Sequence, residues 1–451
     1  RTSKMSHYAN ENIVQVWTPE SRMAHIFSIC DLLRLLGNTL VVLLHGTTVF
    51  SMRHSQDSFK KIFATAHLQF HADYGVWWLF LLSGFFFALK VQRMNVSSIG
   101  DAFTYIGERF IRLWPLVAFK HFLNMVIVDA EVTKNVSVRQ HIFSLGLLQN
   151  MLPMSQMVVP VSWSVSVDFQ MHVIGLIVFL IGKKIEQKVG AKPSHSTFVV
   201  FALLAMLMRS AIVSKSGCVD QIVKQESIHV STFITPYDWE RLTSKLPELR
   251  DMPYEFDPIQ LENHHCWLNN IWTSTSASFL PFILGCYLGW IIPKELKNGK
   301  VMFPWILGKP AKVFTVGLIL NSLRADNHNR SFLRDLSVMS FVISIGLYQL
   351  FWVNRPIILG RSQKMIRWLS QMTYAVYLFH LQPISVFVLA LKRPWSDLEY
   401  ITPVLFSFLP PLYLLSCPFH YCIERPPLTL YGGGRRSPKF ALNSDHRVKT
   451  N

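Results

Sequence analysis

Long apolar runs separated by short polar and basic segments make up most of the chain. A helix needs about 20 residues to cross the hydrocarbon core of a bilayer, so these runs predict membrane-spanning helices. A further apolar stretch at 142–152 is too short to cross and is expected in the interface or in a re-entrant segment. The ten predicted spans cover residues 26–50, 75–89, 113–128, 163–182, 197–214, 276–293, 313–323, 336–353, 371–391 and 401–423.

The predicted fold is all-α, a polytopic transmembrane helix bundle of about ten spans with one larger outer loop at 215–275. The membrane domain covers residues 26–423, between an N-terminal segment at 1–25 and a basic tail at 424–451. Because the chain begins at Arg1 rather than Met, the first segment is interpreted as a possible fragment start. The low share of charged residues, 16%, fits one membrane domain better than several soluble ones.

Basic residues predict which side of the membrane each segment faces. With both termini inside, the inner segments hold 26 of the 44 Lys and Arg, and the longer outer segments hold 15. Since basic residues collect on the cytoplasmic side, both termini are predicted to be cytoplasmic. The same rule accounts for the formal net charge of +17. A bundle of apolar helices offers no groove-reading module, so no nucleic-acid partner is expected.

The predicted outer segments carry signals of an extracytoplasmic environment. The sequons at Asn135 and Asn329 lie outside and predict a glycoprotein, whereas the sequon at Asn95 lies inside and would go unused. Cys218 and Cys266 lie in the outer loop, where they pair if that side is oxidising and stay free if it is not. The other four cysteines lie in or beside apolar segments, as small hydrophobic residues.

Ionisable groups within a membrane span are costly, so the three in the first span require an explanation. Arg34 and His45 are eleven residues apart, which puts them on one helix face about 16 Å apart along the axis. Asp31 is one turn before Arg34 and can pair with it. In one interpretation Asp31 and Arg34 neutralise each other while His45 bonds a neighbouring helix. In the other, Arg34 binds an anion and His45 is a general base.

Seven segments, in order along the chain, resemble motifs of the acyltransferase-3 family. The first, DLLRLLGNTLVVLLHG, resembles the family's first-helix motif, in which an Arg precedes a His by ten intervening residues. The segment ASFLPFILGCYLGW matches the animal branch, the nose-resistant-to-fluoxetine-like proteins. Together the segments extend over about residues 26–430. The other five are GVWWLFLLSGFFFAL, ERFIRLWP, VSWSVSVDFQ, LSQMTYAVYLFHLQPI and CIERPP.

The resemblance implies roles for particular residues. Arg34, helped by Arg109 and Arg112, would bind the donor, and His45 would be the catalytic base. Asp168 and His172 are also assigned to catalysis, orienting the base or the acceptor. They depart from the family pattern, which has Glu and Tyr there, as does Leu32, where Gly is usual. A helix places Asp168 and His172 on one face, so the carboxylate can orient the imidazole.

Other motif residues have structural alternatives. Arg109 and Arg112 also fit ordinary positive-inside anchors, and Trp163 fits an interfacial belt better than a substrate platform. His380, one turn after Tyr377, is structural unless the bundle brings it near His45. Lys120, His121 and Arg209 have no motif support and receive no function. The residues assigned structural or acceptor-side roles are Asp31, Trp163, Ser164, Tyr377, His380 and Glu424.

The resemblance implies a membrane-embedded O-acyltransferase. It would move an acyl group from a cytoplasmic thioester, acyl-CoA, to a hydroxyl on a lipid, glycan or small molecule. No cofactor and no metal site are expected, with acyl-CoA as co-substrate and membrane lipids as surroundings. One alternative is a transporter or carrier of lipids or small hydrophobic molecules, with the same polar groups lining a pathway. Another is a catalytically silent scaffold that uses the outer loop. Plasma membrane and endoplasmic reticulum are not distinguished.

Overall fold

The computed structural model describes most of the predicted membrane domain, and all regular structure in the described part is helical. Residues 217–273 of the outer loop, with Cys218 and Cys266, lie outside the described residues, as do the sequon asparagines Asn95, Asn135 and Asn329. The residues described are 18–51, 72–94, 96, 98–127, 136–153, 156–189, 195–216, 274–276, 278–323, 336–353, 362–384 and 398–427.

A helix lies at each of the ten predicted spans, which confirms the all-α membrane fold. The helices are α1 (Pro19–Ser51), α3 (Ala72–Met94), α4 (Ile99–Ile127), α7 (Trp163–Val189), α8 (His195–Ser216), α12 (Phe279–Asn298), α13 (Lys309–Leu323), α14 (Leu336–Phe351), α15 (Ser362–Phe379) and α17 (Leu398–Phe419). Four stretches of the described chain are both long and apolar enough to cross a bilayer, namely Glu20–Leu43, Gly75–Met94, Pro160–Gly182 and Phe279–Asn298. The count of ten spans stays a prediction.

Helices α3 and α12 cross at very short range because glycines line their contact. A Cβ at Gly285 would lie 1.9 Å from the carbonyl oxygen of Leu81, and one at Gly84 would lie 2.0 Å from that of Phe282. Small residues let backbones approach closely in membrane bundles, where dispersion rather than the hydrophobic effect drives helix association. The Gly-spaced segment noted in the sequence therefore fixes α12 against α3.

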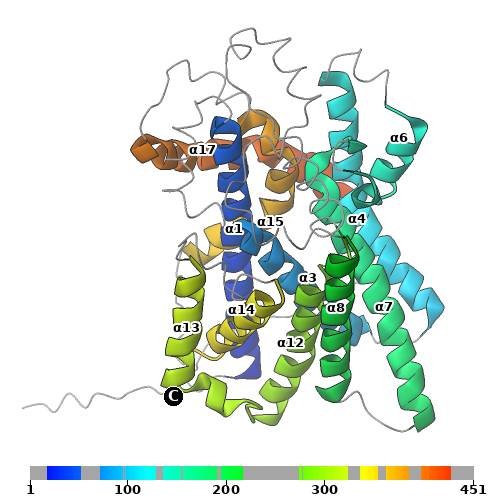
Figure 1. Ribbon diagram of the computed structural model, residues 1–451, viewed down its shortest axis with the longest axis vertical. Helices are drawn as coiled ribbons and strands as arrows, with labels where there is room; N and C mark the ends of the chain where they lie inside the picture. The colour runs from blue at the N-terminus through cyan, green and yellow to red at the C-terminus, as the bar shows by residue number, and fades with distance from the viewer. Residues whose placement is uncertain are drawn as a thin grey trace, which may run out of the picture.

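The bundle surrounds α1, which stands in the middle of Figure 1 with α3 and α15 beside it. In that view α17 runs crosswise to α1 near the C-terminal end of α1. Val42 of α1 packs against Phe408 and Leu412 of α17, and the side-chain amide of Asn38 donates to the hydroxyl of Tyr413 at 3.3 Å. α17 thus closes one end of the bundle over α1.

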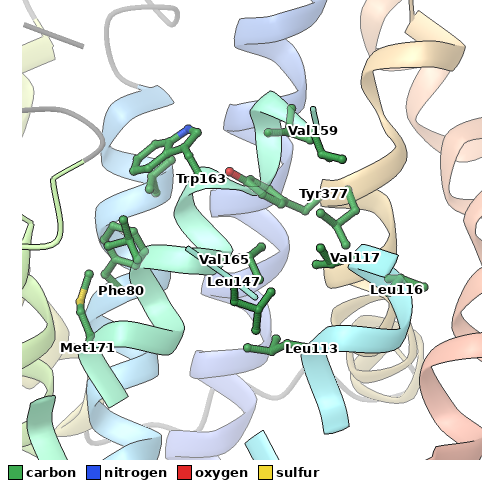
Figure 2. Packing of buried hydrophobic residues seen from close by; sticks show 14 of the residues in the cluster. Phe80, Leu113, Leu116, Val117, Leu147, Val159, Trp163, Val165, Met171 and Tyr377 are labelled. Atoms are coloured by element: carbon green, nitrogen blue, oxygen red, sulfur yellow. The ribbon is translucent and has the colours of Figure 1, made fainter. Parts of the chain in front are cut away.

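The main apolar core lies among α3, α4, α7 and α15. Figure 2 shows Phe80, Trp163 and Tyr377 packed into it with aliphatic side chains from α4 and α7. The outward face of α8 is apolar as well: Val199, Val200, Leu203, Leu204 and Leu207 are all exposed. An apolar core and an apolar exterior together fit a bundle whose solvent is lipid.

The short apolar stretch at 142–152 forms a small helix beside α4, α6 (Val138–Leu145), followed by a single 3-10 turn. Ser137 and Gln140 form a capping box at the start of α6. Val138 and Ile142 are exposed at 74% and 60%. An exposed apolar side on a short capped helix is typical of a segment lying in the membrane interface.

Candidate active site

Two histidines from distant parts of the sequence meet inside the bundle. His45 lies near the end of α1, and His380 directly follows α15. Nδ1 of His45 lies 2.5 Å from Nε2 of His380, and the two rings are inclined by only 5°. Such geometry fits a hydrogen bond in the plane of both rings. The bundle therefore brings His380 next to His45, the condition under which His380 was expected to have more than a structural role.

The bonds of His380 determine which nitrogen of His45 is left for chemistry. Nδ1 of His380 lies 2.6 Å from the carbonyl oxygen of Tyr377, which only accepts, so this nitrogen donates. In a neutral imidazole the other nitrogen then accepts, so Nε2 of His380 receives the proton of Nδ1 of His45. Nε2 of neutral His45 is left with its lone pair. A general base requires this state.

The three arginines predicted to bind the donor gather in one place. Arg34 interacts electrostatically with Arg109, and Arg112 interacts with both. Cζ of Arg34 lies 4.3 Å from the ring centroid of Phe86, and its ion pair with Asp31 is long, at 3.7 Å. Like charges brought together in a low dielectric repel one another, so an anion bound among them is strongly favoured.

Arg109 is held by a network that joins α3, α4 and α7. Its Nη2 donates to Oδ2 of Asp168, and the hydroxyl of Ser83 donates to Oδ1 of the same carboxylate. Oγ of Ser83 lies 2.8 Å from Nε2 of His172, and the hydroxyl of Tyr105 lies 2.6 Å from Nδ1 of that ring. Asp168 and His172 share one face of α7, as the sequence predicted.

The protons of this network can be assigned from its acceptors. Asp168, as a carboxylate, only accepts, so the Ser83 proton points to it. Nε2 of His172 must then donate to Oγ of Ser83, and the Tyr105 hydroxyl donates to Nδ1 of His172. Both nitrogens of neutral His172 are engaged. Nε2 of His172 and Oδ1 of Asp168 are 3.7 Å apart, too far for a direct hydrogen bond. The carboxylate therefore contacts the imidazole through Ser83.

Two acidic residues tie helices together around the arginines. Oδ1 of Asp31 accepts from the hydroxyl of Ser370 at 2.9 Å, which joins α1 to α15. Glu424, in the π-helix His420–Glu424 that continues α17, is buried and lies 2.8 Å from Nδ1 of His420. Glu424 also attracts Arg112. The closing Glu-Arg-Pro motif is thus folded back onto the arginine cluster.

Trp163 occupies the core, not the lipid interface. It is 6% exposed and packs edge-on against Phe80, with ring centroids 6.4 Å apart (Figure 2). The interpretation of Trp163 as an interfacial belt residue is therefore wrong, because α7 begins inside the bundle. The neighbouring Ser164 makes a 2.6 Å hydrogen bond with the hydroxyl of Tyr377. The backbone carbonyl of the same tyrosine accepts from His380.

Sequence reasoning did not single out two members of the site. Ser83 lies within the quoted aromatic segment, but nothing in its spacing marks it as the bridge between Asp168 and His172. Tyr105 is four residues before Arg109 and therefore on the same face of α4, a signal available in the sequence. The catalytic roles of Asp168 and His172 stay predictions.

Comparison with known families matches residues 28–417 to the acyltransferase-3 model, described as an acyltransferase domain. No curated protein and no solved structure matches the chain. The matched range contains Arg34, His45, Arg109, Asp168 and His380, but ends before Glu424. Because the match covers most of the chain, and the described part is a bundle of apolar helices, the chain belongs to the acyltransferase-3 family and is a membrane acyltransferase.

Proposed function

We propose that the protein transfers an acyl group from cytoplasmic acyl-CoA to a hydroxyl at or beyond the outer half of the membrane. The observation that carries the proposal is the chain of bonds from the Tyr377 carbonyl through His380 to His45. It holds His45 in one tautomer and leaves Nε2 as a base. An acceptor hydroxyl needs such a base before it can attack a thioester at neutral pH.

The proposed reaction needs no covalent enzyme intermediate. Nε2 of His45 removes the acceptor hydroxyl proton as the oxygen attacks the thioester carbonyl carbon. The new C–O bond pushes the carbonyl electron pair onto oxygen. When the carbonyl re-forms, the C–S bond breaks, and the thiolate of CoA takes the proton from His45. His380 is a positioning residue, because it touches His45 rather than the substrate.

The donor phosphates are assigned to the arginine cluster. Arg34 and Arg112 supply the cationic groups, while Arg109 is already bound by Asp168. In this proposal Asp168, Ser83 and His172 orient Arg109 and do not exchange protons with the substrate. Arg34 and His45 lie about 16 Å apart along α1, a separation that the long arm of CoA can span. The thioester then lies beside His45 while the phosphates stay near the cytoplasmic side.

The finer features of the proposal come from the sequence. The segment ASFLPFILGCYLGW supports placement in the animal nose-resistant-to-fluoxetine-like branch. The basic-residue distribution supports cytoplasmic termini, and the sequons at Asn135 and Asn329 support a glycoprotein. A lipid, glycan or small-molecule hydroxyl is the proposed acceptor.

The test is acyl transfer by purified protein in lipid nanodiscs. Labelled acyl-CoA is supplied with a panel of hydroxyl lipids, glycans and small alcohols, and products are identified by mass spectrometry. We expect transfer to one acceptor class, with a fall of about 10²- to 10⁴-fold in kcat for His45→Ala. The matched control is His141→Ala, on α6, whose imidazole bonds His121 and none of the site residues named above. Wild-type rates for His45→Ala would reject the proposal.

The same preparation tests the carrier alternative, because the arginine cluster could also line a pathway. Uptake of labelled lipid into proteoliposomes is measured beside acyl transfer. Uptake that survives His45→Ala, with no transfer by the wild type, would assign the protein to the carriers. Transfer that is lost in His45→Ala while uptake is unchanged would assign it to the enzymes.

A further inference from the structure

Lys120 is a buried lysine that the proposed reaction has not used. It lies in α4, is 1% exposed, and its Nζ has no hydrogen-bond partner among the described residues. Nζ lies 5.2 Å from the ring centroid of Phe379. Withdrawing an ammonium group from water is unfavourable unless something compensates its charge. A site that keeps such a group needs a reason for it.

The position of Lys120 repeats the register of the first helix. Arg34 and His45 are eleven residues apart on α1, and Arg109 and Lys120 are eleven residues apart on α4. In a regular helix eleven residues are close to three turns, which places each pair on one face about 16 Å apart; in α4, Pro115 lies between Arg109 and Lys120. The first residues of the two pairs, Arg34 and Arg109, interact electrostatically.

Lys120 also lies near the histidine pair, on the side of His380. Lys120 interacts electrostatically with His380, the residue that bonds His45. Phe379, on which the ammonium rests, directly precedes His380 in the chain. On each of the two helices a guanidinium group precedes a second basic group by eleven residues. The two guanidinium groups lie near each other, and the Lys120 ammonium lies near His380, the partner of His45.

A second unpartnered polar atom belongs to a residue close to His380 in the chain. Oε1 of Gln382 is buried without a hydrogen-bond partner in the described chain, two residues after His380. The amide nitrogen of Gln382 donates at 3.0 Å to Asn124, which is one turn after Lys120 on α4. One buried donor on α4 and one buried acceptor after α15 thus lack hydrogen-bond partners in the described chain. Buried polar atoms are rarely left without partners, so both atoms indicate a ligand near His380.

We infer that Lys120 is a further catalytic residue, whose ammonium binds the oxyanion formed when the acceptor oxygen attacks the thioester. This inference rests on the proposed acyl transfer. As the C–O bond forms, the carbonyl pair becomes a full charge on oxygen, and Nζ supplies the opposite charge. When the carbonyl re-forms and the C–S bond breaks, that charge leaves as the thiolate, which is protonated by His45. Fixed cationic donors in a low-dielectric site stabilise such charge far more than water does.

One substitution separates the effect of Lys120 on catalysis from its effect on stability. Lys120→Met keeps the length of the side chain and removes the charge. The kcat for acyl transfer should fall about 10²- to 10³-fold, as for loss of one oxyanion donor, with KM for both substrates within threefold of wild type. The thermal midpoint should stay at or above the wild-type value, because a buried unpaired charge is gone. Lys184→Met, on the exposed side of α7, is the matched control.

Each other result overturns the inference. An unchanged kcat in Lys120→Met, beside an active wild type, rejects the oxyanion role and leaves the proposed reaction standing. A raised acceptor KM with unchanged kcat would make Lys120 a ground-state binding group for an acidic acceptor. If kcat and thermal midpoint fall together, or if neither Lys120→Met nor Lys120→Gln folds, Lys120 is structural. If the wild type itself shows no acyl transfer, the proposed function is rejected. The assay of the wild type alone identifies that case.

Discussion

The glycine contact between α3 and α12 gives a sharp prediction about stability. In Gly285→Ala the new Cβ would lie 1.9 Å from the carbonyl oxygen of Leu81, whereas ordinary contact begins at 3.4 Å. The neighbour is backbone and cannot rotate away, so the helices must separate by about 1.5 Å. A gap of that order forfeits half or more of the dispersion energy along the contact. We expect a loss of about 3 kcal/mol, at the upper end of overpacking costs.

The matched control is Gly317→Ala on α13, where an added Cβ meets no described atom within 4 Å. There the substitution should be neutral or stabilising by up to about 1 kcal/mol, because alanine is the better helix former. Both variants are heated in the same detergent at one scan rate and followed by intrinsic tryptophan fluorescence. The thermal midpoint should fall by several degrees in Gly285→Ala and hold in Gly317→Ala. Equal midpoints for the two variants would refute the close crossing of α3 and α12.

Three further substitutions test the site. Arg112→Gln should raise KM for acyl-CoA about tenfold or more with little change in kcat, because a charge-assisted contact is lost. Arg139→Gln on α6 is the control and should leave KM unchanged. Equal KM values for the two variants would show that Arg112 does not bind the donor. Asp168→Asn leaves Arg109 without its counter-charge and should lower the thermal midpoint more than Glu108→Gln, whose 2.7 Å partner Lys90 is half-exposed. A larger fall in Glu108→Gln would contradict the importance of the buried pair. His380→Ala releases the tautomer of His45 and should lower kcat about 10- to 100-fold at unchanged KM, a smaller loss than in His45→Ala; no loss would disprove the positioning role.

The helices and the first-helix pair were predictable from the sequence because each rests on a local pattern. Apolar runs set the helices, and a spacing of eleven residues sets the register of Arg34 and His45. The joining of Asp168 and His172 through Ser83 was not predictable, since Ser83 is 85 residues from Asp168 along the chain. Trp163 was misplaced for a related reason: its aromatic type fits a membrane interface equally well, and only packing against Phe80 decides.

Lys120 shows the same limit in another form. A single lysine in an apolar helix carries no motif, and its spacing from Arg109 becomes informative only once α4 is seen to share the site with α1. Its closeness to His380 depends on how α15 packs. Periodicity gives the face of a helix, but not what the face meets.

The most direct test of His45 as the base is chemical rescue. His45→Gly removes the imidazole and leaves room for a small molecule in its place. Added imidazole should restore acyl transfer by purified His45→Gly in a saturable manner, with the rate rising as a larger share of imidazole is unprotonated. Imidazole should not rescue Arg34→Gly. If His45→Gly transfers acyl groups at the wild-type rate without imidazole, His45 is not the base and the account is contradicted.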